Sequence, residues 1–154
     1  MQKKTIAVVG AGSKAGAAVI KAAEEVGRLV AQRGAVLICG GLGGVMEAAA
    51  RGAQAEGGIT VGILPQLNKG DANPYITVPI ATGFGEGRNV VIVRSSDALI
   101  AVGGEYGTLS EIAFGLKTGK PVIGISTWDI KGIIKAADAE DAVNKAFELL
   151  SRSQ

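Results

Sequence analysis

Three times along this chain, a short apolar run is followed by a glycine-rich turn and then by a helical pattern. The segments in this order are Ile6–Val9 with Gly10–Ser13, Val36–Cys39 with Gly40–Gly44, and Ala98–Val102 with Gly103–Gly107. Short, almost wholly apolar runs are typical of strands buried on both faces, and their alternation with helices predicts βαβ units. The sequence therefore predicts an α/β fold, a Rossmann-like three-layer αβα sandwich with a mainly parallel sheet.

Hydrophobic spacing and turn residues predict the positions of the elements. Strands are expected at Thr5–Val9, Ala35–Cys39, Ile59–Leu64, Tyr75–Val78, Ala98–Val102, Val122–Ile125 and, as a short addition, Ile133–Ala136. Helices are expected at Ala17–Arg33, Val45–Glu56, Arg88–Ser95, Thr108–Thr118 and Ala139–Ser151, and a loop at Gln66–Pro74. The length of 154 residues and the absence of an interdomain linker predict a single domain, residues 1–154.

The glycine turns after the apolar runs form the predicted binding site. In parallel α/β sheets, ligands bind at the carboxyl ends of the strands, where the strand order reverses. Glycines let the backbone approach a ligand closely, and the following helix offers unpaired N–H groups and a positive dipole end that suit a phosphate. We therefore expect one anion-binding crevice, with contacts from Gly10, Gly12, Ser13, Gly40, Gly41, Gly43, Gly44, Val45, Met46, Arg88, Gly103, Gly104, Gly107 and Thr108.

The first two turns differ from standard nucleotide motifs. The Gly10-Ala11-Gly12 spacing has its third glycine one residue late for the dinucleotide fingerprint, and Gly40-Gly41 occupy the place of the acidic residue that reads the ribose. The segment 40–44 also lacks the Lys-Ser/Thr ending of a P-loop. These differences argue against a standard NAD site and against P-loop ATP hydrolysis. For the first turn, a tight βα connection and a phosphate contact both remain open.

Three side chains near the later turns have competing interpretations. Arg88 stands at a predicted helix start, where a cation is unfavourable for the helix dipole, and this mismatch favours a role with an anionic ligand. Thr108 and Glu111 match the Thr-x-x-Glu pattern of a capping box, in which each side chain satisfies an N–H group at the helix start. The alternative is that Thr108 binds an anion and Glu111 faces the crevice as a carboxylate.

Composition excludes several classes of function. The chain has no histidine, which removes the commonest general base and metal ligand and any Ser-His-Asp triad. The single cysteine, Cys39, lies in an apolar run and is expected to be a small core residue, and no metal site is expected. The net charge is +2 and the basic residues are dispersed, which argues against nucleic-acid binding. With no signal peptide or membrane-length apolar run, we expect a cytoplasmic protein.

Three motifs carry a resemblance to a known superfamily, namely Gly40–Glu47, Gly85–Asn89 and Gly103–Glu111. The chain resembles the superfamily of the LONELY GUY cytokinin-activating phosphoribohydrolases, often named lysine decarboxylases, and of the molybdenum cofactor carrier proteins. The resemblance extends from Ile6 to about Ile125. It implies a Rossmann-like fold, a crevice for a nucleotide or a phosphorylated cofactor, and a homodimer or homotetramer. No lysine is clearly placed for pyridoxal phosphate chemistry, so decarboxylation is not expected.

The phosphoribohydrolase branch carries Pro-Gly-Gly-x-Gly-Thr-x-x-Glu, with an Arg-Lys pair upstream. Gly103 stands here in place of the proline, Glu105 in place of the second glycine and Asn89 in place of the lysine. The family's other functional positions are kept as Arg88, Gly107, Thr108 and Glu111. In that branch the arginine and the glutamate act at the ribose, where positive charge develops as the N-glycosidic bond breaks. The Gly-Gly-Glu-Tyr-Gly-Thr version looks more like the carrier branch, whose members bind molybdenum cofactor, a pterin bearing a phosphate.

Two functions and a weaker third follow from these observations. The first is a binding protein that holds a phosphorylated small molecule, either molybdenum cofactor or a nucleotide, at the glycine turns. The second is a nucleoside 5′-monophosphate phosphoribohydrolase with Arg88 and Glu111 as its catalytic residues. A protein whose main role is assembly is the third. The only tryptophan, Trp128, either packs against the core or forms a subunit contact, and the sequence does not decide between these.

Overall fold

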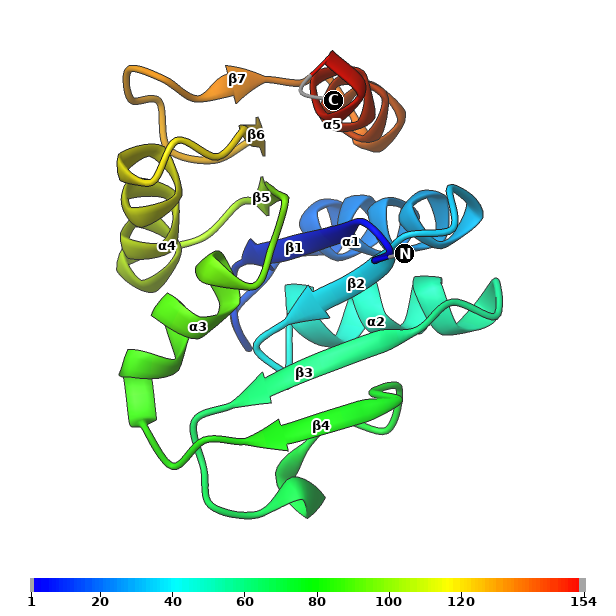
Figure 1. The fold of residues 1–154 in the computed structure, drawn as a ribbon, viewed down its shortest axis with the longest axis vertical. Coiled ribbons are helices and arrows are strands. Elements are labelled where there is room, and N and C mark those ends of the chain that lie inside the picture. Colours follow the sequence, from blue (N-terminus) through cyan, green and yellow to red (C-terminus); the bar gives the residue numbers. More distant parts are fainter. Residues whose placement is uncertain (1, 153–154) are drawn as a thin grey trace.

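A computed structural model describes residues 2–152 as one sheet between two layers of helices (Figure 1). The strands are β1 (Thr5–Gly10), β2 (Val36–Cys39), β3 (Thr60–Leu64), β4 (Val78–Ala81), β5 (Ala98–Val102), β6 (Val122–Ile125) and β7 (Ile134–Lys135). The α-helices are α1 (Ala17–Gln32), α2 (Val45–Ala55), α3 (Arg88–Arg94), α4 (Tyr106–Lys117) and α5 (Ala139–Arg152). Short 3₁₀ helices cover Lys69–Asp71 and Gly85–Gly87.

The sheet is parallel throughout and has the order β4-β3-β2-β1-β5-β6-β7. From β1 the chain runs outward to β4 on one side, and it then returns to add β5 on the other side. The strand order therefore reverses between β1 and β5, and the carboxyl ends of these two strands frame the place where such folds bind ligands. The predicted α/β class and parallel sheet are confirmed.

Alternate residues of each central strand enter two separate cores. Ile6 and Val8 of β1 pack with α1, α2 and α5, whereas Ala7 and Val9 pack with α3 and α4. Such strands are apolar along their whole length because both faces are covered. The first core includes Cys39, which is fully buried, as the sequence predicts. Within residues 2–152, no helix has the length and apolar character needed to cross a membrane.

The strand predicted at Tyr75–Val78 is wrong in position, because β4 runs from Val78 to Ala81. Before it, the Thr60 hydroxyl donates to the Tyr75 carbonyl at 2.6 Å, and the N–H of Thr77 donates to the Thr60 carbonyl at 3.0 Å, so this segment is held by side-chain as well as backbone hydrogen bonds. A proline lacks an N–H donor and disfavours a strand interior, but Pro79 is accommodated because β4 lies at the sheet edge. The remaining predicted strands and helices are present with small shifts at their ends.

Candidate functional site

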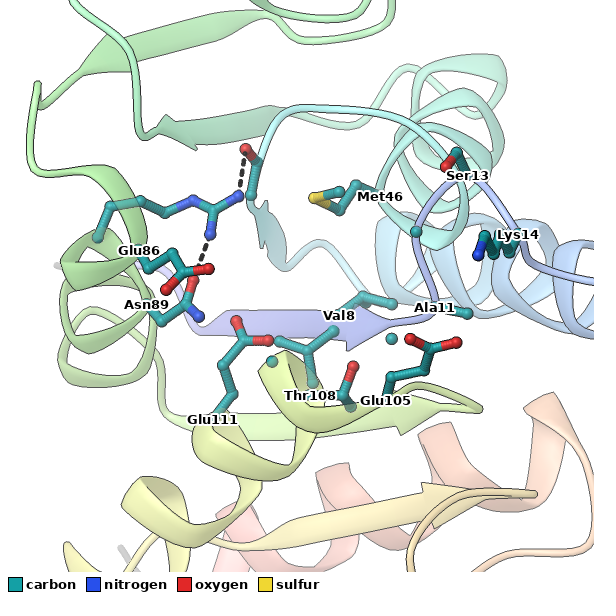
Figure 2. Close-up of a pocket in the computed structure, with 16 residues that line it drawn as sticks. Val8, Ala11, Ser13, Lys14, Met46, Glu86, Asn89, Glu105, Thr108 and Glu111 are labelled. Atoms are coloured by element: carbon teal, nitrogen blue, oxygen red, sulfur yellow. Dashed lines mark hydrogen bonds between the residues drawn. The ribbon is translucent and has the colours of Figure 1, made fainter.

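A crevice of about 410 Å³ opens at the carboxyl ends of β1, β2 and β5 (Figure 2). This volume lies within the range of sites that hold small molecules and cofactors. Segments from four parts of the chain form its wall, namely the end of β1 with its turn, the β2–α2 connection, the start of α3 and the start of α4. The lining residues are Val8, Val9, Gly10, Ala11, Gly12, Ser13, Lys14, Gly40, Met46, Glu86, Arg88, Asn89, Glu105, Gly107, Thr108 and Glu111.

The structure divides the predicted site residues into two groups. Those that line the crevice are Gly10, Gly12, Ser13, Gly40, Met46, Arg88, Gly107, Thr108 and Glu111. Those that do not line it are Gly41, Gly43, Gly44, Val45, Gly103 and Gly104. The first group comes from all three glycine turns, so the expected convergence of these turns on one crevice is present in the fold.

The β2 turn has contacts that account for the glycine and valine at its end. Gly44 has φ +67°, and a Cβ there would lie 2.1 Å from the carbonyl oxygen of Gly12. Val45, which follows it, is fully buried and donates its N–H to the carbonyl of Ala11 at 2.9 Å. The β2 turn is therefore packed directly against the β1 turn. Because Gly44 has no side chain, the backbone of Ala11 and Gly12 can lie against it.

Helix α4 begins earlier than predicted, and this excludes the capping-box interpretation of Thr108 and Glu111. The helix starts at Tyr106 with Glu105 as its N-cap, and no side chain makes a capping hydrogen bond there. Thr108 consequently lies inside the first turn, where it is buried and lines the crevice. The first N–H groups of a helix have no acceptor within that helix, and at α4 they lie beside the crevice. An anion is a suitable partner for them.

Arg88 is fixed by three acceptors, one in β3, one in the β2 turn and one on its neighbour Asn89. Its Nε donates to the Ile63 carbonyl at 2.8 Å, one terminal nitrogen donates to the Gly40 carbonyl at 3.4 Å, and the other donates to Oδ1 of Asn89. Burial lowers the pKa of Arg88, although the nearby carboxyl group of Glu111 opposes this change. The guanidinium group is thus a positioned cation, and several of its five N–H groups are already used.

Glu111 is the buried carboxyl group of the crevice. Only 9% of the residue is exposed. Burial raises the pKa of its side chain to about 7, and the positive charge of Arg88 opposes the rise. A carboxyl group in such surroundings exchanges a proton near neutral pH, as groups at functional sites often do. Glu111 lines the crevice, as the second interpretation of the Thr-x-x-Glu pattern expects.

Comparison with a protein-family model gives a match over residues 3–150 to the SLOG cluster4 family. The chain belongs to this family. Among solved structures, the molybdenum cofactor binding protein from Rippkaea orientalis superposes with a TM-score of 0.93 at 36% identity, covering 97% of this chain and 99% of that one. The molybdenum cofactor carrier protein of Chlamydomonas reinhardtii gives a TM-score of 0.90 at 33% identity, with the same two coverages.

A phosphoribohydrolase is also related to this SLOG cluster4 protein. The cytokinin riboside 5′-monophosphate phosphoribohydrolase of Mycobacterium tuberculosis is 35% identical over 138 residues, which cover 80% of this chain and 71% of that protein. Both branches of the superfamily that the motifs indicate are thus found among the relatives. The resemblance predicted from the three motifs is confirmed.

The SLOG cluster4 crevice also contains polar side chains that sequence reasoning did not select. These are Lys14, Glu86, Asn89 and Glu105. Each is a chain neighbour of a selected residue or lies within one of the quoted motifs. That position in the sequence could have indicated that these side chains line the site. Figure 2 shows Glu105 and Glu111 on opposite sides of Thr108 along the α4 wall.

The lining therefore mixes charges of both signs. Two cations, Lys14 and Arg88, face a crevice that also holds the carboxyl groups of Glu86, Glu105 and Glu111. The side chains therefore give the crevice no net positive charge that would attract an anion. Oriented backbone N–H groups have to supply much of the attraction. Within residues 2–152, no cluster of three or more acidic, cysteine or histidine side chains has an arrangement that could hold a metal ion.

Proposed function

We propose that this protein binds a small molecule that combines a phosphate with a donor-rich heterocycle, and that molybdenum cofactor is its ligand. The observation that carries this proposal is the mixed chemistry of the crevice. The uncapped start of α4 and Thr108 provide donors for a phosphate, whereas Glu86 and Glu105 provide carboxylate acceptors for N–H groups. A phosphorylated pterin has both requirements in one molecule. The similarity to molybdenum cofactor binding proteins supports the same ligand class.

In this proposal each part of the crevice has a binding role. The phosphate lies against the N–H groups of Gly107 and Thr108, with further contacts from Gly12 and Ser13. Arg88 contributes a fixed positive charge from the opposite wall. Met46 adds an apolar, polarizable surface of the kind that accepts a flat ring. The protein supplies orientation and exclusion of water, and the chemistry of the cofactor itself is left for an acceptor protein.

Two features argue for binding over hydrolysis. Breaking an N-glycosidic bond is helped by an ionised carboxylate beside the developing cation, but burial raises the pKa of Glu111 to about 7. Arg88, which keeps its place in the hydrolase motif, donates to Ile63, Gly40 and Asn89 within the protein. Hydrolysis remains the alternative function because Arg88 and Glu111 both line the crevice and a phosphoribohydrolase is among the relatives.

Ligand identification tests the proposal. Protein purified without oxygen from a host that makes molybdenum cofactor is denatured under oxidising conditions, and the released pterin is identified by fluorescence and mass spectrometry. We expect a phosphorylated pterin, and we expect the same protein to release no adenine from AMP. Release of adenine that is abolished in Glu111→Ala, together with no bound pterin, would overturn the proposal in favour of the hydrolase.

We also propose a homodimer or homotetramer. Apolar side chains remain exposed at Phe84, Val90 and Tyr106, with 66%, 42% and 80% of each residue exposed, and each of these residues lies within two positions of one that lines the crevice. Large apolar groups left exposed can mark a contact with another subunit. Light scattering coupled to size-exclusion chromatography measures the mass, and a monomer of 15.5 kDa would contradict this expectation.

A further inference from the structure

The turn that joins β5 to α4 is held from outside the crevice by the last residue of β6 and the residues that follow it. The N–H of Gly103 donates to the carbonyl of Ile125 at 3.0 Å. The hydroxyl of Thr127 donates to the carbonyl of Gly103 at 2.5 Å. The indole N–H of Trp128 donates to the carbonyl of Glu105 at 3.0 Å. Three hydrogen bonds therefore fix a segment of three residues, and we call residues 125–128 the β6 bracket.

The bracketed segment needs external support because it consists mainly of glycine. Gly103 and Gly104 both have positive φ, +61° and +106°, and neither offers a side chain that would hold the conformation. A flexible segment that orders only on binding loses conformational entropy, and this loss weakens affinity. Hydrogen bonds that order the segment beforehand remove part of that loss.

The β6 bracket is itself held in one conformation by its backbone and its contacts. Ser126 has φ +48°, and among residues 2–152 it is the only residue other than glycine with a positive φ. Such a backbone conformation is unfavourable for a residue with a Cβ atom and persists where surrounding contacts enforce it. Gly124 leaves room for Thr127, because a Cβ at Gly124 would lie 2.6 Å from the Thr127 methyl group. The ring of Trp128 also packs on that of Tyr106, with their centres 5.7 Å apart.

The contact to Glu105 connects the β6 bracket to the proposed phosphate subsite. Glu105 is the N-cap of α4, and its carbonyl also accepts the N–H of Leu109 at 3.0 Å. That carbonyl shares its peptide group with the N–H of Tyr106, the first residue of α4, and it accepts the first hydrogen bond of the helix. A change in its orientation would therefore shift the helix start, where the N–H groups of Gly107 and Thr108 lie. Trp128 and Thr127 do not line the crevice, and their effect on a ligand must pass through this turn.

We propose that Thr127 and Trp128 are positioning residues that pre-order the Gly103–Glu105 turn for anion binding. This inference rests on the proposed function, since it assigns a role in binding a phosphorylated ligand at the start of α4. It also gives Trp128 a function in the site that neither simple packing nor a subunit contact provides.

Four variants test this role, with AMP as the phosphorylated probe and calorimetry as the measure of affinity. Thr127→Val keeps the shape of the side chain and removes its donor, whereas Thr127→Ser keeps the donor. Trp128→Phe keeps an aromatic ring and removes the indole N–H. Thr118→Val is the matched control, because the Thr118 hydroxyl also donates to a backbone carbonyl, that of Phe114 at 2.9 Å, at the far end of α4.

We expect Thr127→Val and Trp128→Phe each to weaken AMP binding by about fivefold to tenfold, which corresponds to roughly one hydrogen bond's contribution. Thr127→Ser and Thr118→Val should bind as the unaltered protein does. The inference is overturned if both donor-deleting variants bind AMP normally, or if Thr127→Ser is as weak as Thr127→Val. If Thr127→Val does not fold, Trp128→Phe decides the result. Failure of the unaltered protein to bind AMP or any other phosphorylated probe would instead overturn the proposed function.

Discussion

The turns after β2 and after β5 are both rich in glycine, yet the structure uses them in different ways. The β2 turn presses its backbone against the β1 turn, where a Cβ at Gly44 would meet the carbonyl oxygen of Gly12 at 2.1 Å. The β5 turn leads into α4, whose residues Gly107 and Thr108 line the crevice. In the β2 turn, Gly44 makes room for the backbone of a neighbouring turn, whereas after the β5 turn it is Gly107, in the first turn of α4, that lines the ligand space.

The largest expected effect comes from filling the packed turn. Gly44→Ala would place a methyl group against the backbone oxygens of both Ala11 and Gly12 at a residue with φ +67°. We expect a loss of at least about 4 kcal/mol in the free energy of unfolding, seen as a fall of about 10 °C or more in the melting temperature.

Gly43→Ala is the matched control from the same turn. A Cβ at Gly43 would have no atom within 4 Å, and its φ is not positive. We expect the melting temperature to change by no more than about 3 °C. Equal damage from the two substitutions would show that glycine is needed throughout the β2 turn for a reason other than backbone packing.

The sequence predicts this fold well because its signals are local and repeated. Apolar strands, glycine turns and amphipathic helices place nearly every element, and the order of the turns gives the binding edge. The prediction was wrong at β4, where Pro79 made an edge strand hard to recognise, and it placed the start of α4 two residues late, where Thr108 and Glu111 match a capping-box pattern that the helix does not use. Which glycines face a ligand could not be predicted, because contacts such as Gly44 with Gly12 join segments that are distant in the chain.

The buried carboxyl group of Glu111, on the α4 wall of the crevice, is a position where a substitution should stabilise the protein. Glu111 has a pKa of about 7 in the folded protein against an ordinary value of 4.5. The folded state therefore binds the proton more tightly, and its stability falls as the pH rises from about 4.5 through 7. Glu111→Gln removes this loss, so at pH 8 its free energy of unfolding should be higher by up to about 3 kcal/mol and its melting temperature should rise. Near pH 4.5 the two proteins should differ little.

Melting curves from pH 4.5 to 8 measure this difference. Glu86→Gln is the control, since Glu86 lines the same crevice but is exposed. It should leave the melting temperature nearly unchanged at every pH. A Glu111→Gln protein that loses stability relative to the unaltered protein at pH 8 would mean that the ionised Glu111 makes a favourable contact that outweighs its burial.

Thr108→Val should separate binding from stability at the β5 turn. The change keeps the shape of a buried side chain and removes the hydroxyl from the crevice wall. A hydrogen bond to a charged phosphate contributes about 1.5 kcal/mol or more, so we expect AMP to bind about tenfold more weakly. The melting temperature should move by less than about 3 °C. Normal binding with a clearly lower melting temperature would assign Thr108 a purely structural role.

The smallest expected effect concerns Glu105, the residue that departs most from the phosphoribohydrolase motif. Its carboxylate lines the crevice beside the start of α4, where it repels an anion. Glu105→Gln should bind AMP about twofold to fivefold more tightly in dilute buffer, and salt should reduce the gain because it screens exposed charges. Weaker AMP binding after this substitution would show that the Glu105 carboxylate accepts a hydrogen bond from AMP, as it is proposed to do from the pterin.

The first strand of the chain is also the central strand of the sheet, between β2 and β5. Thr5, at its start, donates its N–H to Asp97 at 2.8 Å across a separation of 92 positions. While the chain is being synthesised, β1 and β2 can pair early, but the other edge of β1 stays open until residues 98–102 have emerged from the ribosome. Pairings between such distant segments form slowly. The crevice needs both edges of β1, and it is therefore completed only late in folding, after most of the chain has been made.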